Sequence, residues 1–311
     1  MNNNESKNFS IESIQQDLQN HGYICQSDIA TAVYLALMLN KPILVEGPPG
    51  VGKTELAKTC SSILNKPLIR LQCYEGLDET KALYEWKYAK QLLYTQVLKE
   101  QLQDVLQGAK GLAASVQRLH DYGDIFFSKD FLEPRPLLQA LQSPQGAVLL
   151  IDEIDKADEE FESLLLEILS DFQISVPEIG TVTANSIPLV FLTSNSTREM
   201  SDALKRRCLH LYIPFPDVNL EQRIVQSRVP GLSEELARQL ARFIHAVRDL
   251  DLKKQPAISE SLDWAKTLLL LHADQLDIDL VRQTLNVVLK YQDDIDNVAG
   301  QLSQLVRQAT E

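Results

Sequence analysis

The sequence predicts an α/β domain with a five-stranded parallel sheet between layers of helices, followed by a small all-helical domain. Short apolar runs alternate with helical patterns over the first two thirds of the chain, which is typical of a parallel sheet covered on both faces. A Gly-rich loop directly follows the first apolar run. Beyond Pro216 the apolar residues recur at helical spacing, and no strand pattern is found there.

The expected strands are four or five residues long and apolar. They cover residues 43–46, 68–72, 148–151, 189–193 and 209–213. Helices are expected at about 10–20 and at 28–39, where Ser27 and Asp28 offer an N-cap. Between the second and third strands, a helical pattern from 79 to about 106, followed by glycines and prolines, indicates an insertion at about 74–146.

These patterns divide the chain into three parts. Residues 1–27 form a polar N-terminal lead, 28–216 the α/β domain with its insertion, and 217–311 the helical domain. Pro214 and Pro216 mark the second boundary. One apolar helix face in the last part consists of Leu236, Leu240, Phe243, Ile244 and Val247. Further helices are expected at 261–271, 279–291 and 293–308.

Composition limits the possible functions. The chain has 311 residues with 44% hydrophobic residues, no apolar run near the ~18–20 residues of a membrane helix, and no apolar signal core in its polar first ten residues. We therefore expect a cytoplasmic protein without membrane insertion. The net charge of −13 argues against a broad nucleic-acid interface. Four scattered cysteines without a C-x-x-C pair, and five dispersed histidines, predict reduced thiols and no zinc site.

The loop after the first strand has the form G-x-x-x-x-G-K-[ST]. Its residues are Gly47, Pro48, Pro49, Gly50, Val51, Gly52, Lys53 and Thr54. A strand that enters such a turn and leaves it as a helix points backbone N–H groups and the positive helix end at one anion. We expect Lys53 to reach the β and γ phosphates of a nucleotide, and the Thr54 hydroxyl to ligate Mg²⁺. The loop does not distinguish ATP from GTP.

Polar residues end two of the expected buried strands. Asp152 and Glu153 follow 148–151; we expect Asp152 beside Thr54 in the Mg²⁺ shell and Glu153 to accept a proton from the attacking water. Asn195 follows 189–193 and would orient that water. The alternatives are two solvated acids at a strand end and an ordinary turn asparagine.

Two adjacent arginines, Arg206 and Arg207, precede the fifth expected strand. An arginine that reaches a neighbouring subunit's γ phosphate stabilises the charge of the transition state. The alternative is a surface pair of ion-pairing arginines.

Taken together, these motifs resemble an AAA+ ATPase, and within that superfamily the MoxR family. The segments that resemble its CoxD-like branch, associated with maturation of carbon monoxide dehydrogenase-type molybdenum enzymes, are 84–88 (YEWKY), 135–138 (RPLL), 151–158 (IDEIDKAD), 193–199 (TSNSTRE) and 203–208 (ALKRRC). The resemblance covers roughly residues 28–290. It implies a ring, commonly a hexamer, with ATP and Mg²⁺ at subunit interfaces, a von Willebrand factor A domain partner, and a client that is remodelled or receives a metal cofactor.

The resemblance also assigns roles to the residues already named. Lys53 and Thr54 belong to Walker A, Asp152 and Glu153 to Walker B, and Asn195 to sensor 1. The arginine finger falls on Arg207, with Arg206 as the alternate, and the helical domain is the lid.

One position departs from the family pattern. Glu260 stands where the second-sensor arginine is expected, so no second sensor is assigned. Two other functions stay open, namely an NTP-driven motor of a restriction or DNA-processing complex and a non-hydrolysing nucleotide switch.

Two segments are candidates for partner contacts. A helix at 161–170 leads into an expected hairpin at 174–182, which either faces a ring pore or only caps the sheet. The aromatic residues Tyr84, Trp86, Tyr88 and Tyr94 either bind a partner or belong to the core.

Overall fold

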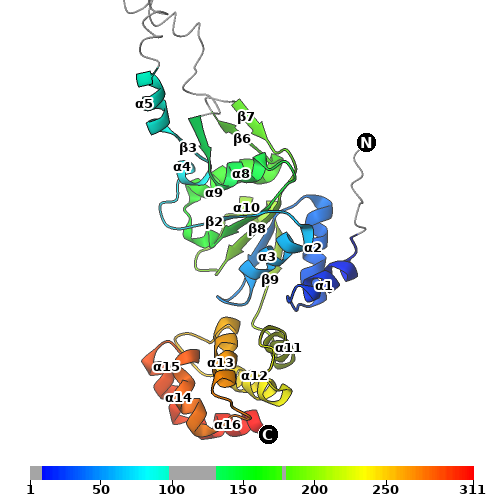
Figure 1. Ribbon diagram of the computed structural model, residues 1–311, viewed down its shortest axis with the longest axis vertical. Coiled ribbons are helices and arrows are strands. Elements are labelled where there is room, and N and C mark those ends of the chain that lie inside the picture. The colour runs from blue at the N-terminus through cyan, green and yellow to red at the C-terminus, as the bar shows by residue number, and fades with distance from the viewer. Residues whose placement is uncertain (1–8, 98–130, 177–179) are drawn as a thin grey trace, which may run out of the picture.

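The computed structural model describes residues 9–97, 131–176 and 180–311 (Figure 1). Five parallel strands form the central sheet, in the order β2 (Leu68–Gln72), β5 (Val148–Asp152), β8 (Leu189–Ser194), β1 (Ile43–Glu46) and β9 (Leu209–Tyr212). All five predicted strands are confirmed to within one residue at their ends. The order places β1 between β8 and the edge strand β9, so its carboxyl end lies between the carboxyl ends of two parallel neighbours.

Helices cover both faces of this sheet. On β5, Val148 and Leu150 face a core shared with α3 (Lys53–Leu64), while Leu149 and Ile151 face a core shared with α8 (Pro136–Gln142) and α9 (Glu159–Asp171). Both sides of the strand are fully buried, which explains why it reads as an unbroken apolar run. The predicted fold class is confirmed.

The N-terminal segment packs against the sheet domain. Helix α1 (Ile11–Asn20) is N-capped by Ser10, whose hydroxyl accepts a hydrogen bond from the Ser13 N–H, and it lies against α2 (Ser27–Leu39). Ile14 and Leu18 are buried in the same core as β1 because they share one helix face. Within the described residues, the expected polar lead therefore contributes to the core of the domain that follows it.

The insertion after β2 is only partly helical. Its described elements are α4 (Glu79–Ala82), β3 (Tyr84–Trp86), α5 (Tyr88–Val97) and β4 (Leu132–Pro134). The prediction of one helix from residue 79 is wrong at β3, because this segment pairs antiparallel with β4, a contact that local periodicity does not encode. The part of that predicted helix beyond residue 97 lies outside the described residues.

The candidate partner segments have different surroundings. The α9 helix leads into the antiparallel pair β6 (Gln173–Val176) and β7 (Gly180–Thr183), which confirms the hairpin; its turn lies outside the described residues. Of the four aromatic residues, Trp86 is buried, whereas Tyr88 and Tyr94 are exposed. Tyr84 packs edge-on against Trp86, and Tyr94 packs edge-on against Phe131.

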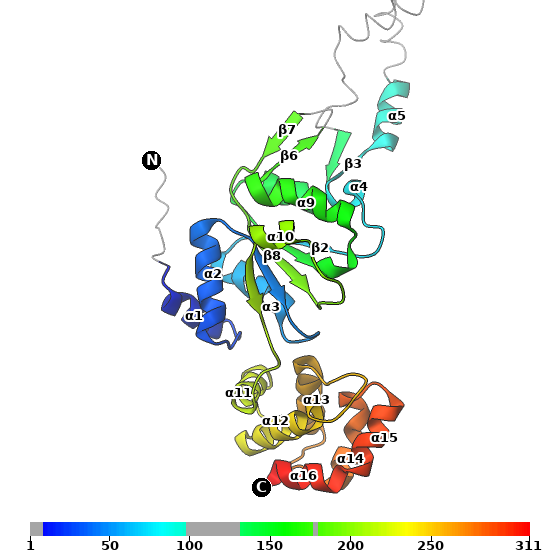
Figure 2. The ribbon, with the colours of Figure 1, turned by 180° about the vertical axis from the view of Figure 1, so that it is seen from behind.

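The region after Pro216 is helical (Figure 2). It consists of α11 (Val218–Arg228), α12 (Glu234–Arg248), α13 (Ile258–Leu270), α14 (Ile278–Val288), α15 (Gln292–Gly300) and α16 (Leu302–Thr310). The predicted face of α12 is confirmed, since its five apolar residues are buried around Trp264. The single helix predicted at 293–308 is instead divided between α15 and α16, near Gly300. No helix in the described ranges is long and apolar enough to cross a membrane.

Candidate functional site

The loop between β1 and α3 has a backbone that requires glycine. Gly47, Gly50 and Gly52 have φ values of 147°, 73° and 99°, which side chains strongly disfavour. A Cβ on Gly47 would lie 2.1 Å from the Ile213 carbonyl oxygen, because the loop passes directly against the chain that follows β9. The glycines therefore fix the path of the loop and expose its backbone at the N-terminus of α3.

Lys53 is held beneath this loop. Its side chain is buried, and Nζ donates to the carbonyl oxygens of Gly47 at 2.6 Å and Pro48 at 2.8 Å, and to Oδ1 of Asn195 at 2.8 Å. Burial lowers the pKa of Lys53 to about 8, although nearby Asp155 and Asp152 oppose that shift. All three acceptors are neutral, so the ammonium is available to a bound anion.

Thr54, in the first turn of α3, lies beside Asp152 at the end of β5. The Thr54 hydroxyl is 3.1 Å from Asp152 Oδ1, and the carboxylate is almost fully buried at 3% exposure. It also accepts hydrogen bonds from the Thr193 hydroxyl and from the Arg70 guanidinium. A hydroxyl and a carboxylate are hard oxygen donors, which suit Mg²⁺ held mainly by phosphates and water. The residues therefore fit the expected ion.

Glu153 has the left-handed conformation, with φ 57° and ψ 49°. Its N–H donates to the Thr193 hydroxyl at 2.9 Å, which anchors this turn to the neighbouring strand. One carboxylate oxygen, Oε2, accepts from Gln72 Nε2 at 2.9 Å and from Lys156 Nζ at 2.5 Å. Positive φ in a non-glycine residue marks local strain of a kind found at functional sites.

Asp155 also belongs to the candidate site, although no role is predicted for it from the sequence. Its Oδ2 accepts from the backbone N–H of Asn195 at 3.3 Å, and from the N–H and hydroxyl of Thr197 at 3.1 and 2.6 Å. Burial raises the pKa of Asp155, but these hydrogen bonds outweigh it, so the pKa is lowered overall. The ionised carboxylate thus fixes the loop that carries Asn195. The one sequence feature that indicates a role for Asp155 is its position two residues after Glu153.

The two arginines are not brought to the phosphate loop of their own chain. Arg207 ends α10 (Asp202–Arg207), where its Nε donates to the Ser170 hydroxyl at 2.5 Å and its Nη1 to the Ala203 carbonyl at 3.0 Å. Arg206 is exposed and makes no ion pair with any residue that the structure describes. Neither guanidinium has a hydrogen-bond or ion-pair partner in the loop.

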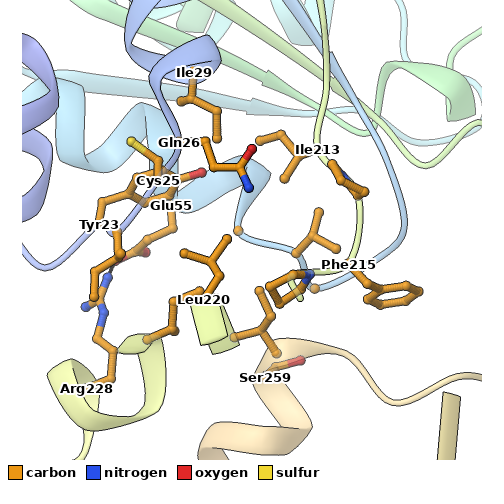
Figure 3. Close-up of a pocket in the computed structure, with 18 of the residues that line it drawn as sticks. Tyr23, Cys25, Gln26, Ile29, Glu55, Ile213, Phe215, Leu220, Arg228 and Ser259 are labelled. Atoms are coloured by element: carbon orange, nitrogen blue, oxygen red, sulfur yellow. Dashed lines mark hydrogen bonds and ion pairs between the residues drawn. The ribbon is translucent and has the colours of Figure 1, made fainter. Parts of the chain in front are cut away.

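A cavity of about 530 Å³ lies between the loop and the helical region (Figure 3). Its walls include Tyr23, Ile29, Ile213 and Leu220, and the Gln26 amide is directed into it. On one side, Arg228 of α11 donates to Glu55 of α3 at 2.8 Å. On another, Ala257 and Ser259 lie so close to the loop that a Cβ on Gly50 would be 2.6 Å from the Ala257 Cβ. Direct contacts between the two regions therefore bound the cavity on these two sides.

Glu260 has a local structural role. Its carboxylate accepts from the Ala257 N–H at 3.1 Å and the Ser259 hydroxyl at 2.8 Å, which caps the N-terminus of α13. Lys254 Nζ lies 3.6 Å from the same carboxylate. A helix N-terminus favours a carboxylate over an arginine, which gives a physical reason for the departure at this position.

Residues 42–208, more than half of the chain, match the family of AAA domains described as the dynein-related subfamily. The chain belongs to this family. Two relatives of this AAA protein are uncharacterized proteins of Staphylococcus aureus (strain bovine RF122 / ET3-1), 27% identical, and Staphylococcus epidermidis, 26% identical. Each alignment spans 238 residues, which is 74% of this chain and 76% of the relative.

Solved structures of Thermotoga maritima RuvB are also similar to this AAA protein. A mutant RuvB has a TM-score of 0.47 at 19% identity, and the match covers 96% of this chain and 78% of the RuvB chain. A structure described as the RuvB Holliday junction branch migration motor has a TM-score of 0.43 at 18% identity, with 94% and 77% covered.

Proposed function

We propose that this AAA protein is an ATPase that hydrolyses ATP at the site formed by Lys53, Thr54, Asp152, Glu153 and Asn195. The observation that carries the proposal is the convergence of side chains from the loop and two strands. Lys53 Nζ is 2.8 Å from Asn195 Oδ1, and Thr54 is 3.1 Å from Asp152. This arrangement offers a cation and an oxygen-rich metal position beside one backbone anion site.

In this mechanism each side chain has a separate task. Lys53 exchanges its carbonyl acceptors for phosphate oxygens, and binding an anion favours its charged form. Thr54 and Asp152 would hold Mg²⁺, which supplies positive charge to the phosphates. Glu153 orients or deprotonates the attacking water, after leaving its contacts with Gln72 and Lys156. Asn195 positions the same water, and Asp155 keeps Asn195 in place.

Assembly into a ring completes the proposed site. Since Arg206 and Arg207 have no partner in their own loop, we propose that one of them reaches the γ phosphate of the next subunit. Arg207 matches the family's arginine-finger position, and its hydrogen bond to the Ser170 hydroxyl fixes its guanidinium at the end of α10. Arg206 is the more exposed of the two and remains the alternate. The ring is proposed to be a hexamer.

The proposed biological role follows from the resemblance to MoxR proteins of the CoxD-like branch. In that role, hydrolysis drives remodelling of a client protein or assembly of its metal cofactor in the cytoplasm, together with a von Willebrand factor A domain partner. The α9–β6–β7 region, of which β7 is mostly exposed, and the exposed face of α5 are candidate contact surfaces for these proteins.

The experiment that tests the proposal compares wild type with Glu153→Gln by mass measurement and nucleotide analysis. We expect Glu153→Gln to retain ATP within a ring-sized particle, because binding groups are intact while the water is no longer activated. Wild type should release ADP. A Glu153→Gln protein that stays monomeric and carries no nucleotide, alongside an equally monomeric and inactive wild type, would overturn the proposal.

A further inference from the structure

Arg70 makes an ion pair with the carboxylate that is proposed to help hold Mg²⁺. It lies on β2, the edge strand beside β5, and its side chain is 49% exposed. Its Nε and Nη2 donate to Asp152 Oδ2 at 3.0 and 2.6 Å. The parallel pairing of β2 with β5 brings the two residues together although they are far apart in sequence.

This contact supplies the charge that Asp152 needs in the absence of a metal ion. In the part of the chain that the structure describes, the other side chains that donate to Asp152 are the neutral hydroxyls of Thr54 and Thr193. Within the described residues, Arg70 is the cation in direct contact with the carboxylate. A carboxylate at 3% exposure without such a partner is costly, so Arg70 stabilises the nucleotide-free site.

Arg70 and Mg²⁺ would therefore both interact with the Asp152 carboxylate. A guanidinium carries no lone pair for a metal, and Mg²⁺ requires oxygen ligands at short distance with nearly octahedral geometry. Two cations at one small buried carboxylate repel each other strongly in a site of low dielectric. We propose that Arg70 is the resident counterion of Asp152 and that Mg²⁺ displaces it when the nucleotide binds. This inference rests on the proposed function.

The surroundings of Arg70 permit that displacement. Half of its side chain already faces solvent at the sheet edge, so it can leave by rotation without opening the core. Its Nη2 also donates to Gln72 Oε1 at 2.6 Å, and Gln72 Nε2 donates to Glu153 Oε2 at 2.9 Å. The exchange of Arg70 for Mg²⁺ thus changes the hydrogen bonds around both acidic residues.

The test measures binding of fluorescent ADP as a function of Mg²⁺ concentration, with no turnover involved. In Arg70→Ala, the Mg²⁺ concentration for half-maximal tightening of ADP binding should fall about fivefold, a modest factor because the ion pair is half exposed. Arg70→Gln should behave in the same way and serves if the alanine variant does not fold. Arg282→Ala removes an exposed arginine of α14 and should equal wild type.

A second measurement is the melting temperature with and without Mg²⁺ and ADP. Without them, Arg70→Gln should melt below wild type; with them, its gain in melting temperature should exceed that of wild type. An unchanged or raised Mg²⁺ requirement in both Arg70 variants, while wild type binds ADP with Mg²⁺, overturns the inference alone. A wild type that does not bind ADP at any Mg²⁺ concentration overturns the proposed function as well.

Discussion

The ammonium of Lys53 donates a hydrogen bond of 2.8 Å to Oδ1 of Asn195, which joins the phosphate loop directly to the end of β8. The two residues are 142 positions apart in the chain. Their contact depends on β1 and β8 being neighbours in the sheet. A phosphate that binds Lys53 will therefore lie next to the Asn195 amide.

This geometry predicts that Asn195→Ala lowers turnover much more than nucleotide affinity. The amide would act on the attacking water, whereas the loop backbone and Lys53 provide most of the binding. We expect kcat to fall about 10²-fold, by analogy with loss of one positioned polar group. Steady-state ATP hydrolysis and fluorescent ADP binding measure the two effects. A parallel loss of ADP affinity would show instead that Asn195 serves mainly to position Lys53.

The lowered pKa of Lys53, about 8, predicts a pH-dependent affinity for nucleotide. Phosphate binding favours the ammonium, so the affinity for ADP should fall by up to about tenfold per pH unit above pH 8. ADP titrations from pH 7 to pH 10 test this expectation. Lys53→Arg, which stays protonated throughout, should lose this dependence. A flat wild-type profile would contradict it.

The same pKa predicts the opposite trend for stability without nucleotide. The pKa is lower in the folded protein than in the unfolded chain, so between pH 8 and about pH 10.4 the unfolded chain binds more protons. Below pH 8, burial of the charged Lys53 side chain therefore lowers the free energy of unfolding by its full amount. This destabilisation diminishes as the pH rises above 8. Lys53→Met should raise the melting temperature of the nucleotide-free protein at pH 7. A lower melting temperature would show that its three hydrogen bonds outweigh the burial of charge.

Gly47 and Gly76 form a matched pair for testing the loop. Both have positive φ, 147° and 78°, but a Cβ on Gly47 would meet the Ile213 carbonyl at 2.1 Å, whereas one on Gly76 meets no atom within 4 Å. Gly76→Ala should cost about 1 kcal/mol of backbone strain. Gly47→Ala should cost at least about 3 kcal/mol, since strain and overpacking add. Denaturant unfolding measures both, and equal costs would exclude the close approach.

The assignment of the arginine finger predicts different effects for two adjacent residues. Arg207→Ala should reduce ATP turnover by about 10³-fold or more and leave ring assembly intact. Arg206→Ala should reduce it by less than tenfold. Hydrolysis assays on both variants, with particle mass measured in parallel, separate the two. The reverse result would assign the role of arginine finger to Arg206, which is the more exposed of the two.

Much of the fold follows from local sequence patterns. The buried strands are uninterrupted apolar runs, and GPPGVGKT specifies its own turn through its glycines. The strand β3 was not predictable from local periodicity, because it depends on pairing with β4, nearly fifty residues later. Likewise, Ile14 and Leu18 lie in a stretch that is polar on average, and only their shared helix face shows that they are buried.

The sequence predicts candidate site residues where one short segment carries the motif. Lys53, Thr54, Asp152 and Glu153 stand directly after apolar strands or in the loop that follows one, and the structure brings Thr54 to within 3.1 Å of Asp152. Arg70, Gln72 and Asp155 were missed, because their roles come from contacts between segments. Arg70 meets Asp152 through the register of β2 against β5, and Asp155 meets Asn195 across a loop. The register that brings Arg70 to Asp152 leaves no spacing pattern in the sequence, and the only local sign of Asp155 is its position two residues after Glu153.

The most direct test of ATP hydrolysis at this site is phosphate release from ATP by wild type and by Glu153→Gln, with Mg²⁺ present. We expect steady release by wild type and a loss of at least about 10²-fold in the variant, with ATP still bound. If wild type binds ATP with Mg²⁺ but releases no phosphate in the assembled state, the protein is a nucleotide switch and the account of Glu153 as the group that activates water is wrong.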